Sequence, residues 1–164
     1  MSKQDDKTQA AKDIAIKALA ARDLTRRELI EFLVSKRHHT EVVDSAISSL
    51  EELGLVDDRR VAEAYVRTRM DQGPIAKVMV ETELLERGIE PETVTTVLGT
   101  MMKGQDEENE ALELARLRVR VSPARLDPDT IRRRVFAYLS RRGFDEETAR
   151  QAVETAAAEY LGRP

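Results

Sequence analysis

The sequence has no cysteine and no tryptophan, and it has only three tyrosines and three phenylalanines among its 164 residues. Without cysteine, the chain can form no disulfide bond, thiol nucleophile or zinc–thiolate site. Apolar residues make up 41% of the sequence, so a core must be built mainly from Leu, Val, Ile and Ala. A thin aliphatic core favours short packed helices over a large sandwich or a deep substrate pocket.

Long hydrophobic runs are also missing. No stretch approaches the roughly 20 consecutive apolar residues that a membrane-spanning helix needs. The first ten residues, MSKQDDKTQA, contain no apolar core of a signal peptide, and we interpret residues 1–10 as a disordered polar tail. A cytoplasmic protein without a membrane contact is therefore expected.

Residues suited to catalysis are scarce. The two histidines, His38 and His39, are adjacent in a predicted turn, and no further metal ligand follows them at helical spacing. The sequence has no glycine-rich phosphate loop. Acid pairs such as Asp57 and Asp58 are better explained as solvated or helix-capping residues. The sequence thus predicts no enzyme activity, no cofactor and no metal site.

An internal repeat organises the chain. Three segments align with spacings of 51 and then 55 residues: LIEFLVSKRHHTEVVDSAI from Leu29, VETELLERGIEPETVTTVL from Val80, and VFAYLSRRGFDEETARQAV from Val135. Leu33, Leu84 and Leu139 share one column, and apolar i, i+4 pairs in each segment predict a helix.

Four residues after this leucine, Gly88 and Gly143 predict a helix end in the left-handed conformation. The first copy has Arg37 in this column, so its helix is expected to end less sharply.

Helix starts are also visible in each copy. Thr25 and Glu28 form a capping box, while Pro74 and Pro128 are predicted at the first position of a helix. A further helix is predicted before each of these, at roughly 10–22, 58–72 and 106–121.

Each repeat is therefore three short helices. The predicted fold is all-α, with three tandem three-helix repeats (residues 11–56, 57–104 and 105–161) stacked into an elongated, curved rod. At the first boundary, Gly54 should end a helix, Leu55 and Val56 should pack back, and Asp57 or Asp58 should cap the next helix.

Charge is strongly segregated along the chain. Residues 116–142 contain nine Arg and two Asp and therefore carry a net charge of +7. Since the net charge of the whole chain is −4, the remaining residues carry −11. All nine bases are Arg, whose planar guanidinium suits bidentate contacts to carboxylate or phosphate. On the last arginine-rich helix, Ile131, Val135, Tyr138 and Leu139 should form the buried stripe. This arrangement leaves Arg132, Arg133, Arg134 and Arg141 largely outward.

Two interpretations of these arginines remain open. They could pair with nearby acids on a solvated surface, or they could bind nucleic acid or an acidic protein surface. Under the second interpretation, the candidate partner-binding residues are Arg26, Arg27, Lys77, Arg116, Arg118, Arg120, Arg125, Arg132, Arg133, Arg134 and Arg141.

The motif ELGLVDDRRVAEAYVRTR, followed by ELLERGI and later by YLSRRGF, resembles the RecX family of recombination regulators. The resemblance extends from about Ala11 onward and includes the three-repeat layout. The segment from Gly73 to Ile89 is about one helical turn longer than the family pattern, so a longer middle helix is expected in the second repeat.

This resemblance implies a three-helix repeat fold and a regulatory protein that binds the RecA recombinase filament. It implies restraint of ATP hydrolysis, strand exchange and co-protease activity, contact with single-stranded DNA through the filament, and a monomeric protein. The alternatives are a nucleic-acid-binding helical adaptor that acts without RecA, and a helical scaffold for another protein.

Overall fold

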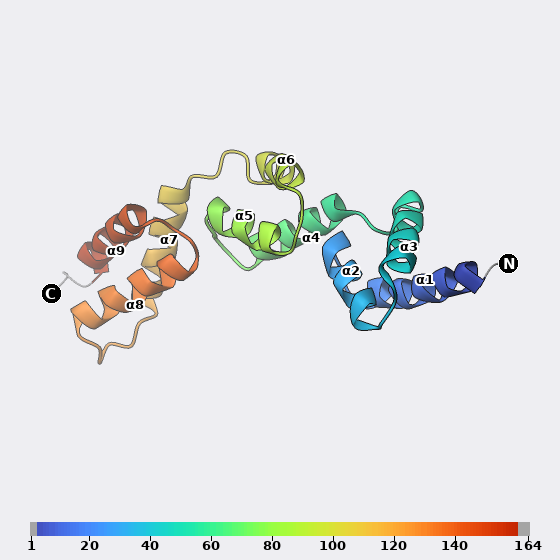
Figure 1. The fold of residues 1–164 in the computed structure, drawn as a ribbon. Helices are drawn as coiled ribbons and strands as arrows, with labels where there is room; N and C mark the ends of the chain where they lie inside the picture. The colour runs from blue at the N-terminus through green and yellow to red at the C-terminus, as the bar shows by residue number, and fades with distance from the viewer. Residues whose placement is uncertain (1–2, 161–164) are drawn as a thin grey trace. The chain divides into compact units, whose positions relative to one another are not determined.

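The computed structural model describes residues 3–160, and this part of the chain forms nine α-helices and no strand (Figure 1). The helices are α1 (Lys3–Ala21), α2 (Arg26–Ser35), α3 (Thr40–Glu52), α4 (Asp58–Asp71), α5 (Lys77–Glu86), α6 (Pro91–Met101), α7 (Glu107–Arg120), α8 (Pro128–Arg141) and α9 (Glu146–Tyr160). The all-α prediction and the succession of three-helix repeats are confirmed.

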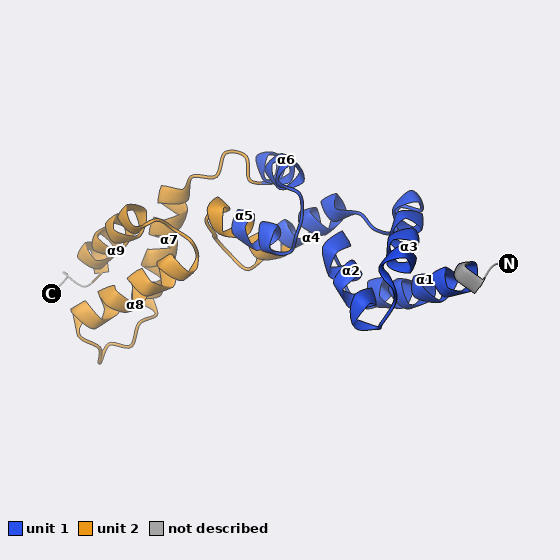
Figure 2. Cartoon of the chain, in the orientation of Figure 1, with its two compact units in different colours: residues 1–67, 81–101 blue, residues 68–80, 102–164 orange. Residues whose placement is uncertain are grey.

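The chain divides into two compact units (Figure 2). Unit 1 contains the described residues up to 67 together with 81–101, and unit 2 contains 68–80 together with the described residues from 102 onward. In unit 1, α1, α2 and α3 pack around Leu29, Leu33 and Ile47. In unit 2, α7, α8 and α9 pack around Val135 and Leu139. Both cores are mainly aliphatic, as the composition predicts, although Phe144 is buried in that of unit 2.

The repeat alignment is supported column by column. Leu33, Leu84 and Leu139 are each 0% exposed. At the helix ends four residues later, Arg37, Gly88 and Gly143 have φ angles of 65°, 81° and 86°. The expectation of a less sharp end at Arg37 is wrong, because the arginine adopts the same left-handed conformation as the two glycines. The backbone bonds that close this turn outweigh the steric cost of its Cβ.

Arg37→Gly should therefore leave stability unchanged or raise it by up to about 1 kcal/mol. Glycine removes a left-handed strain of roughly 1–2 kcal/mol, and its greater freedom in the unfolded chain offsets part of that gain. Urea unfolding measures the difference. Arg37→Ala is the control, since it removes the same side chain and keeps the strain. A clear loss of stability in Arg37→Gly alone would contradict this explanation.

At the boundary between the first two repeats, Asp57 and Asp58 accept hydrogen bonds from different helices. Gly54 ends α3 with a φ of 66°, and Val56 is buried whereas Leu55 is 39% exposed, so only Val56 packs back as expected. Asp57 caps α4, because its Oδ1 accepts from the Arg60 N–H at 3.1 Å. Asp58 instead accepts the N–H of Arg26, the first residue of α2, at 2.6 Å. Burial raises the pKa of the Asp58 carboxyl.

The N-terminal segment differs from the predicted tail over residues 1–10. Helix α1 begins at Lys3 instead of near residue 10, while residues 1 and 2 lie outside the described part. The negative charges of Asp5 and Asp6 in the first turn stabilise the helix, because they lie near the positive end of its dipole. The Gln9 amide also donates to Asp13 at 2.8 Å, one turn later. These local interactions extend the helix through a polar stretch.

The second repeat differs from two expectations. Pro74 does not begin a helix, since α5 starts at Lys77, and α5 has ten residues, the same length as α2. The expected longer middle helix is therefore wrong. The extra residues form a non-helical connection in which Ile75 and Ala76 are fully buried. The prediction for Pro128 is confirmed, because it follows the cap Asp127 at the start of α8.

That connection is held by a contact that recurs between repeats. Arg142 Nε donates to the Pro74 carbonyl at 2.7 Å, and the Arg142 carbonyl accepts from Ala76 N–H at 3.0 Å. In unit 1, Arg87 Nη2 donates to the Asp23 carbonyl at 3.0 Å, and its own carbonyl accepts from Thr25 Oγ1 at 2.8 Å.

In both contacts, the donor and acceptor residues come from the same columns of the repeat alignment. Asp23 aligns with Pro74 and Thr25 with Ala76 at the spacing of 51, while Arg87 aligns with Arg142 at the spacing of 55. We call this pair of contacts the repeat clasp. In unit 1 the clasp also contains the Arg87–Glu28 ion pair at 2.8 Å, and the Arg87 guanidinium lowers the pKa of the Glu28 carboxyl.

A second capping contact accompanies the clasp in unit 2. The N–H of Lys77, at the start of α5, donates to Glu107 of α7 at 2.9 Å. It matches the bond from the Arg26 N–H to Asp58. In both cases an acid near the start of the next repeat satisfies an N–H that has no partner within its own helix.

Candidate functional site

Two arginines of the basic segment are held by carboxylates. Arg116 pairs with Glu113 and Glu159, each at 2.6 Å. Arg132 pairs with Asp129 at 3.0 Å and with Glu154 at 3.5 Å, and its side chain is only 33% exposed. These two residues fit the interpretation as local ion pairs, and Arg132, which was expected to point largely outward, is partly buried against its carboxylate partners.

Three other arginines come together without any carboxylate. Arg118, Arg134 and Arg141 make no ion pair with any residue of the described range 3–160. They line a cavity of about 380 Å³ beside Tyr138. We call this the basic groove. Its complete lining is Arg118, Val121, Ser122, Pro123, Arg134, Val135, Ala137, Tyr138 and Arg141.

Helical spacing explains how the groove forms. Arg134, Tyr138 and Arg141 follow each other at i, i+4 and i+7 on α8, so they share one face. The buried stripe of α8 consists of Ile131, Val135 and Leu139. Tyr138 was also predicted in that stripe, but it lies at the edge of the core and is only partly buried. Because α8 packs against α7, this face meets the last turn of α7 and makes the groove wall.

The groove is organised for anions. The Arg118 guanidinium lies over the Tyr138 ring, with its central carbon 3.9 Å from the ring centroid, which fixes its plane and is worth roughly 0.5–1 kcal/mol at an exposed site. The lining residues include no Asp or Glu. Three guanidinium groups around an aromatic side chain can bind carboxylates or phosphates through paired N–H bonds. The chemistry of the groove therefore suits a negatively charged group.

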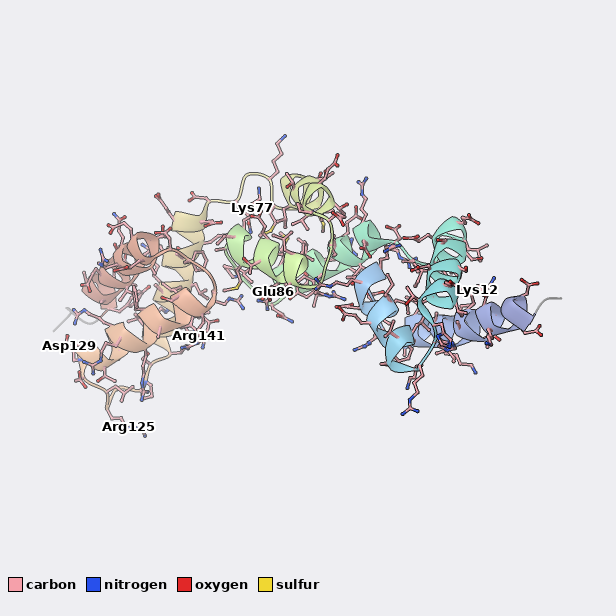
Figure 3. The ribbon with its side chains drawn as sticks, in the orientation of Figure 1. Lys12, Lys77, Glu86, Arg125, Asp129 and Arg141 are labelled. Atoms are coloured by element: carbon pink, nitrogen blue, oxygen red, sulfur yellow. The ribbon has the colours of Figure 1, made fainter. Side chains whose placement is uncertain are left out.

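The remaining candidates do not join this groove. Arg120 lies 5.8 Å from the Tyr160 ring centroid, Arg133 donates to Thr130 at 2.9 Å, and Arg125 is exposed in the connection between α7 and α8 (Figure 3). In α2, Arg26 pairs with Glu51 at 2.8 Å, and Arg27 donates to the Glu86 carbonyl.

Lys77, labelled in Figure 3, is exposed at the start of α5. Of the eleven candidates, only Arg118, Arg134 and Arg141 line the groove. Sequence reasoning underrated Tyr138, whose i+4 spacing from Arg134 was a usable signal.

The histidines lie in a different setting. His38 and His39 line a small cavity of about 270 Å³ with Arg37 and Lys7, and His39 precedes α3 without a capping side-chain bond. Among the described residues, no group of three or more His, Cys, Asp or Glu side chains is placed to hold a metal ion. Within the same range, no helix is long and apolar enough to span a membrane.

Comparisons with known proteins agree with this architecture. Residues 57–98 match the family model described as RecX, second three-helix domain, and residues 106–153 match RecX, third three-helix domain. A regulatory protein RecX from Halorhodospira halophila is 34% identical over 158 residues, covering 95% of this chain and 94% of that protein. One from Mycobacterium leprae is 30% identical over 148 residues, covering 90% of this chain and 86% of the relative.

A solved structure gives the same fold. The crystal structure of RecX from Lactobacillus salivarius superposes with a TM-score of 0.72 at 20% identity, covering 92% of this chain and 97% of that one. At this identity the likeness concerns the fold.

Proposed function

Because the chain belongs to the RecX family of regulatory proteins, we propose that it binds the RecA recombinase or its nucleoprotein filament. Bound there, it restrains ATP hydrolysis, strand exchange and co-protease activity in DNA repair and recombination. The role is regulation by binding, without chemistry of its own. The observation that supports this proposal is the basic groove, where three arginines face a cavity free of acidic lining residues.

A filament of recombinase on DNA offers two kinds of anion, carboxylates on its protein surface and phosphates on its DNA. A single exposed arginine contact contributes less than about 1 kcal/mol. Arg118, Arg134 and Arg141 line one cavity, so one partner can engage all three. Their combined contribution becomes larger when the partner excludes water from the groove.

The test is RecA ATP hydrolysis on single-stranded DNA, measured across a range of concentrations of this protein. We expect the rate to fall and the inhibition to saturate. The control is the protein after heat unfolding, which should not inhibit. A hydrolysis rate unchanged at every concentration would contradict the proposal.

A nucleic-acid adaptor that acts without RecA is the second candidate, because phosphates also fit an arginine groove. Its signature is tight binding to bare single-stranded DNA that weakens steeply with salt. The net charge of −4 opposes such independent binding. Anisotropy of a labelled oligonucleotide, measured at two salt concentrations without RecA, separates the two candidates.

A further inference from the structure

Two aliphatic side chains beside the basic groove are left in solvent. Leu117 is 54% exposed and Val121 is 63% exposed. They are four residues apart, with Leu117 in the last turn of α7 and Val121 as its C-cap, so they lie on one side of the end of the helix. Val121 lines the basic groove, while Leu117 lines a second cavity of about 700 Å³, whose charged lining residues are Glu113, Arg116, Arg120 and Glu159. Leu117 and Val121 thus form an apolar strip that borders two cavities of unit 2, the basic groove and a cavity lined by both Arg and Glu.

Folding of unit 2 does not account for this strip. Helix α7 buries Ala111, Leu114, Ala115 and Val119 in the core, whereas Leu117 and Val121, at i+3 and i+7 from Leu114, stay more than half exposed at the edge of that core. Tyr160, which also lines the second cavity, is 38% exposed. Apolar area that stays in water gives no hydrophobic stabilisation, and patches rimmed by polar residues mark interaction surfaces.

The composition of this face favours a protein partner over nucleic acid. A sugar–phosphate backbone can neutralise Arg118 and Arg134, but it has little apolar surface with which to cover Leu117 and Val121. The Arg118 guanidinium already covers one face of the Tyr138 ring, which leaves less of this ring for the stacking of a base. A protein segment can supply both groups, with carboxylates for the arginines and apolar side chains for the strip.

We propose that Leu117, Val121 and the basic groove together bind an acidic amphipathic segment of a protein. Such a segment carries apolar side chains about one helical turn apart, flanked by Asp or Glu. This inference rests on the proposed function and sharpens it: on the nucleoprotein filament, this face contacts the recombinase and not the DNA.

The experiment compares wild type with the double variant Leu117→Asn and Val121→Thr, whose side chains keep nearly the same shape. The matched control is Leu53→Asn with Val78→Thr, because Leu53 is 66% exposed and Val78 58% exposed away from both cavities. Two quantities are measured: the concentration that half-inhibits RecA ATP hydrolysis, and binding to a labelled oligo-dT without RecA. Circular dichroism and a thermal melt verify folding.

We expect the Leu117/Val121 variant to need at least about tenfold more protein for half-inhibition, because two apolar side chains lose their burial at the contact. Binding to oligo-dT and the Leu53/Val78 control should stay at wild-type values. If wild type inhibits and the Leu117/Val121 variant inhibits equally well, this inference is wrong and the proposed function stands. If wild type does not inhibit, the proposed function itself fails.

A measurement on the unchanged protein guards against misfolding of the variant. With ¹³C-labelled Leu and Val methyl groups, the resonances of Leu117 and Val121 should shift or broaden when RecA is added. Addition of oligo-dT should leave them in place. The opposite pattern would assign this face to nucleic acid and overturn the inference.

Discussion

Replacing Arg118, Arg134 and Arg141 together by Glu should abolish inhibition of RecA ATP hydrolysis, with a loss of at least about 100-fold in potency. Three charge reversals in one cavity turn attraction for an anionic partner into repulsion. The fold should survive, because these side chains make no ion pair with the rest of the described chain. The measurement is the half-inhibiting concentration, read after circular dichroism has verified folding.

The matched control reverses three other exposed cations: Arg22→Glu, Arg67→Glu and Lys103→Glu. It changes the net charge by the same amount, so a general electrostatic effect would weaken both variants equally. We expect the control to inhibit nearly as well as wild type. Equal weakening of the two triples would show that the groove has no special role.

Gly143→Val should destabilise the protein by roughly 3 kcal/mol or more. Gly143 has a φ of 86°, where a β-branched residue is strained by about 1–3 kcal/mol. A Cβ placed there would also lie 2.6 Å from the Cβ of Met79, an atom that cannot move without shifting α5. Such overpacking adds roughly 1–3 kcal/mol. Urea unfolding at 25 °C gives the free energy of unfolding.

Two other glycines separate strain from crowding. Gly54 has a φ of 66° and nothing within 4 Å of an added Cβ, so Gly54→Val measures strain alone. Gly88→Val should be intermediate, because its Cβ meets the flexible side chain of Arg27. We expect losses in the order Gly143, Gly88, Gly54. Equal losses at all three positions would contradict the packing described around α5 and α8.

Local signals in the sequence predicted most of the helices. The capping box of Thr25 and Glu28 is formed in both directions, and Gly88 and Gly143 adopt the predicted left-handed conformation at the helix ends. These features depend on residues within one or two turns of each other. The repeat alignment identified positions that are distant in the sequence but have equivalent structures. Arg37, Gly88 and Gly143 occupy one column, and all three adopt the left-handed conformation.

The sequence could not separate the arginines by role. Arg132, Arg133 and Arg134 are consecutive, yet one pairs with acids, one bonds to Thr130 and one enters the groove. The difference depends on Glu154 of α9 and on the position of α7, which the local pattern does not contain. The prediction for the connection before α5 failed for a similar reason. The backbone of this connection is held by a hydrogen bond from the distant Arg142 to the Pro74 carbonyl, and Pro74 does not begin a helix there.

The repeat clasp uses different residue types in the three copies. Its arginine donor is present in the second and third repeats, but the aligned residue of the first is Lys36, which lies over its own Phe32 at 5.3 Å. Its carbonyl acceptor is present in the first and second repeats, but the aligned residue of the third is Asp129, inside the first turn of α8. In the language of polymers, the clasp is the linkage between successive monomers, formed once through Arg87 and once through Arg142.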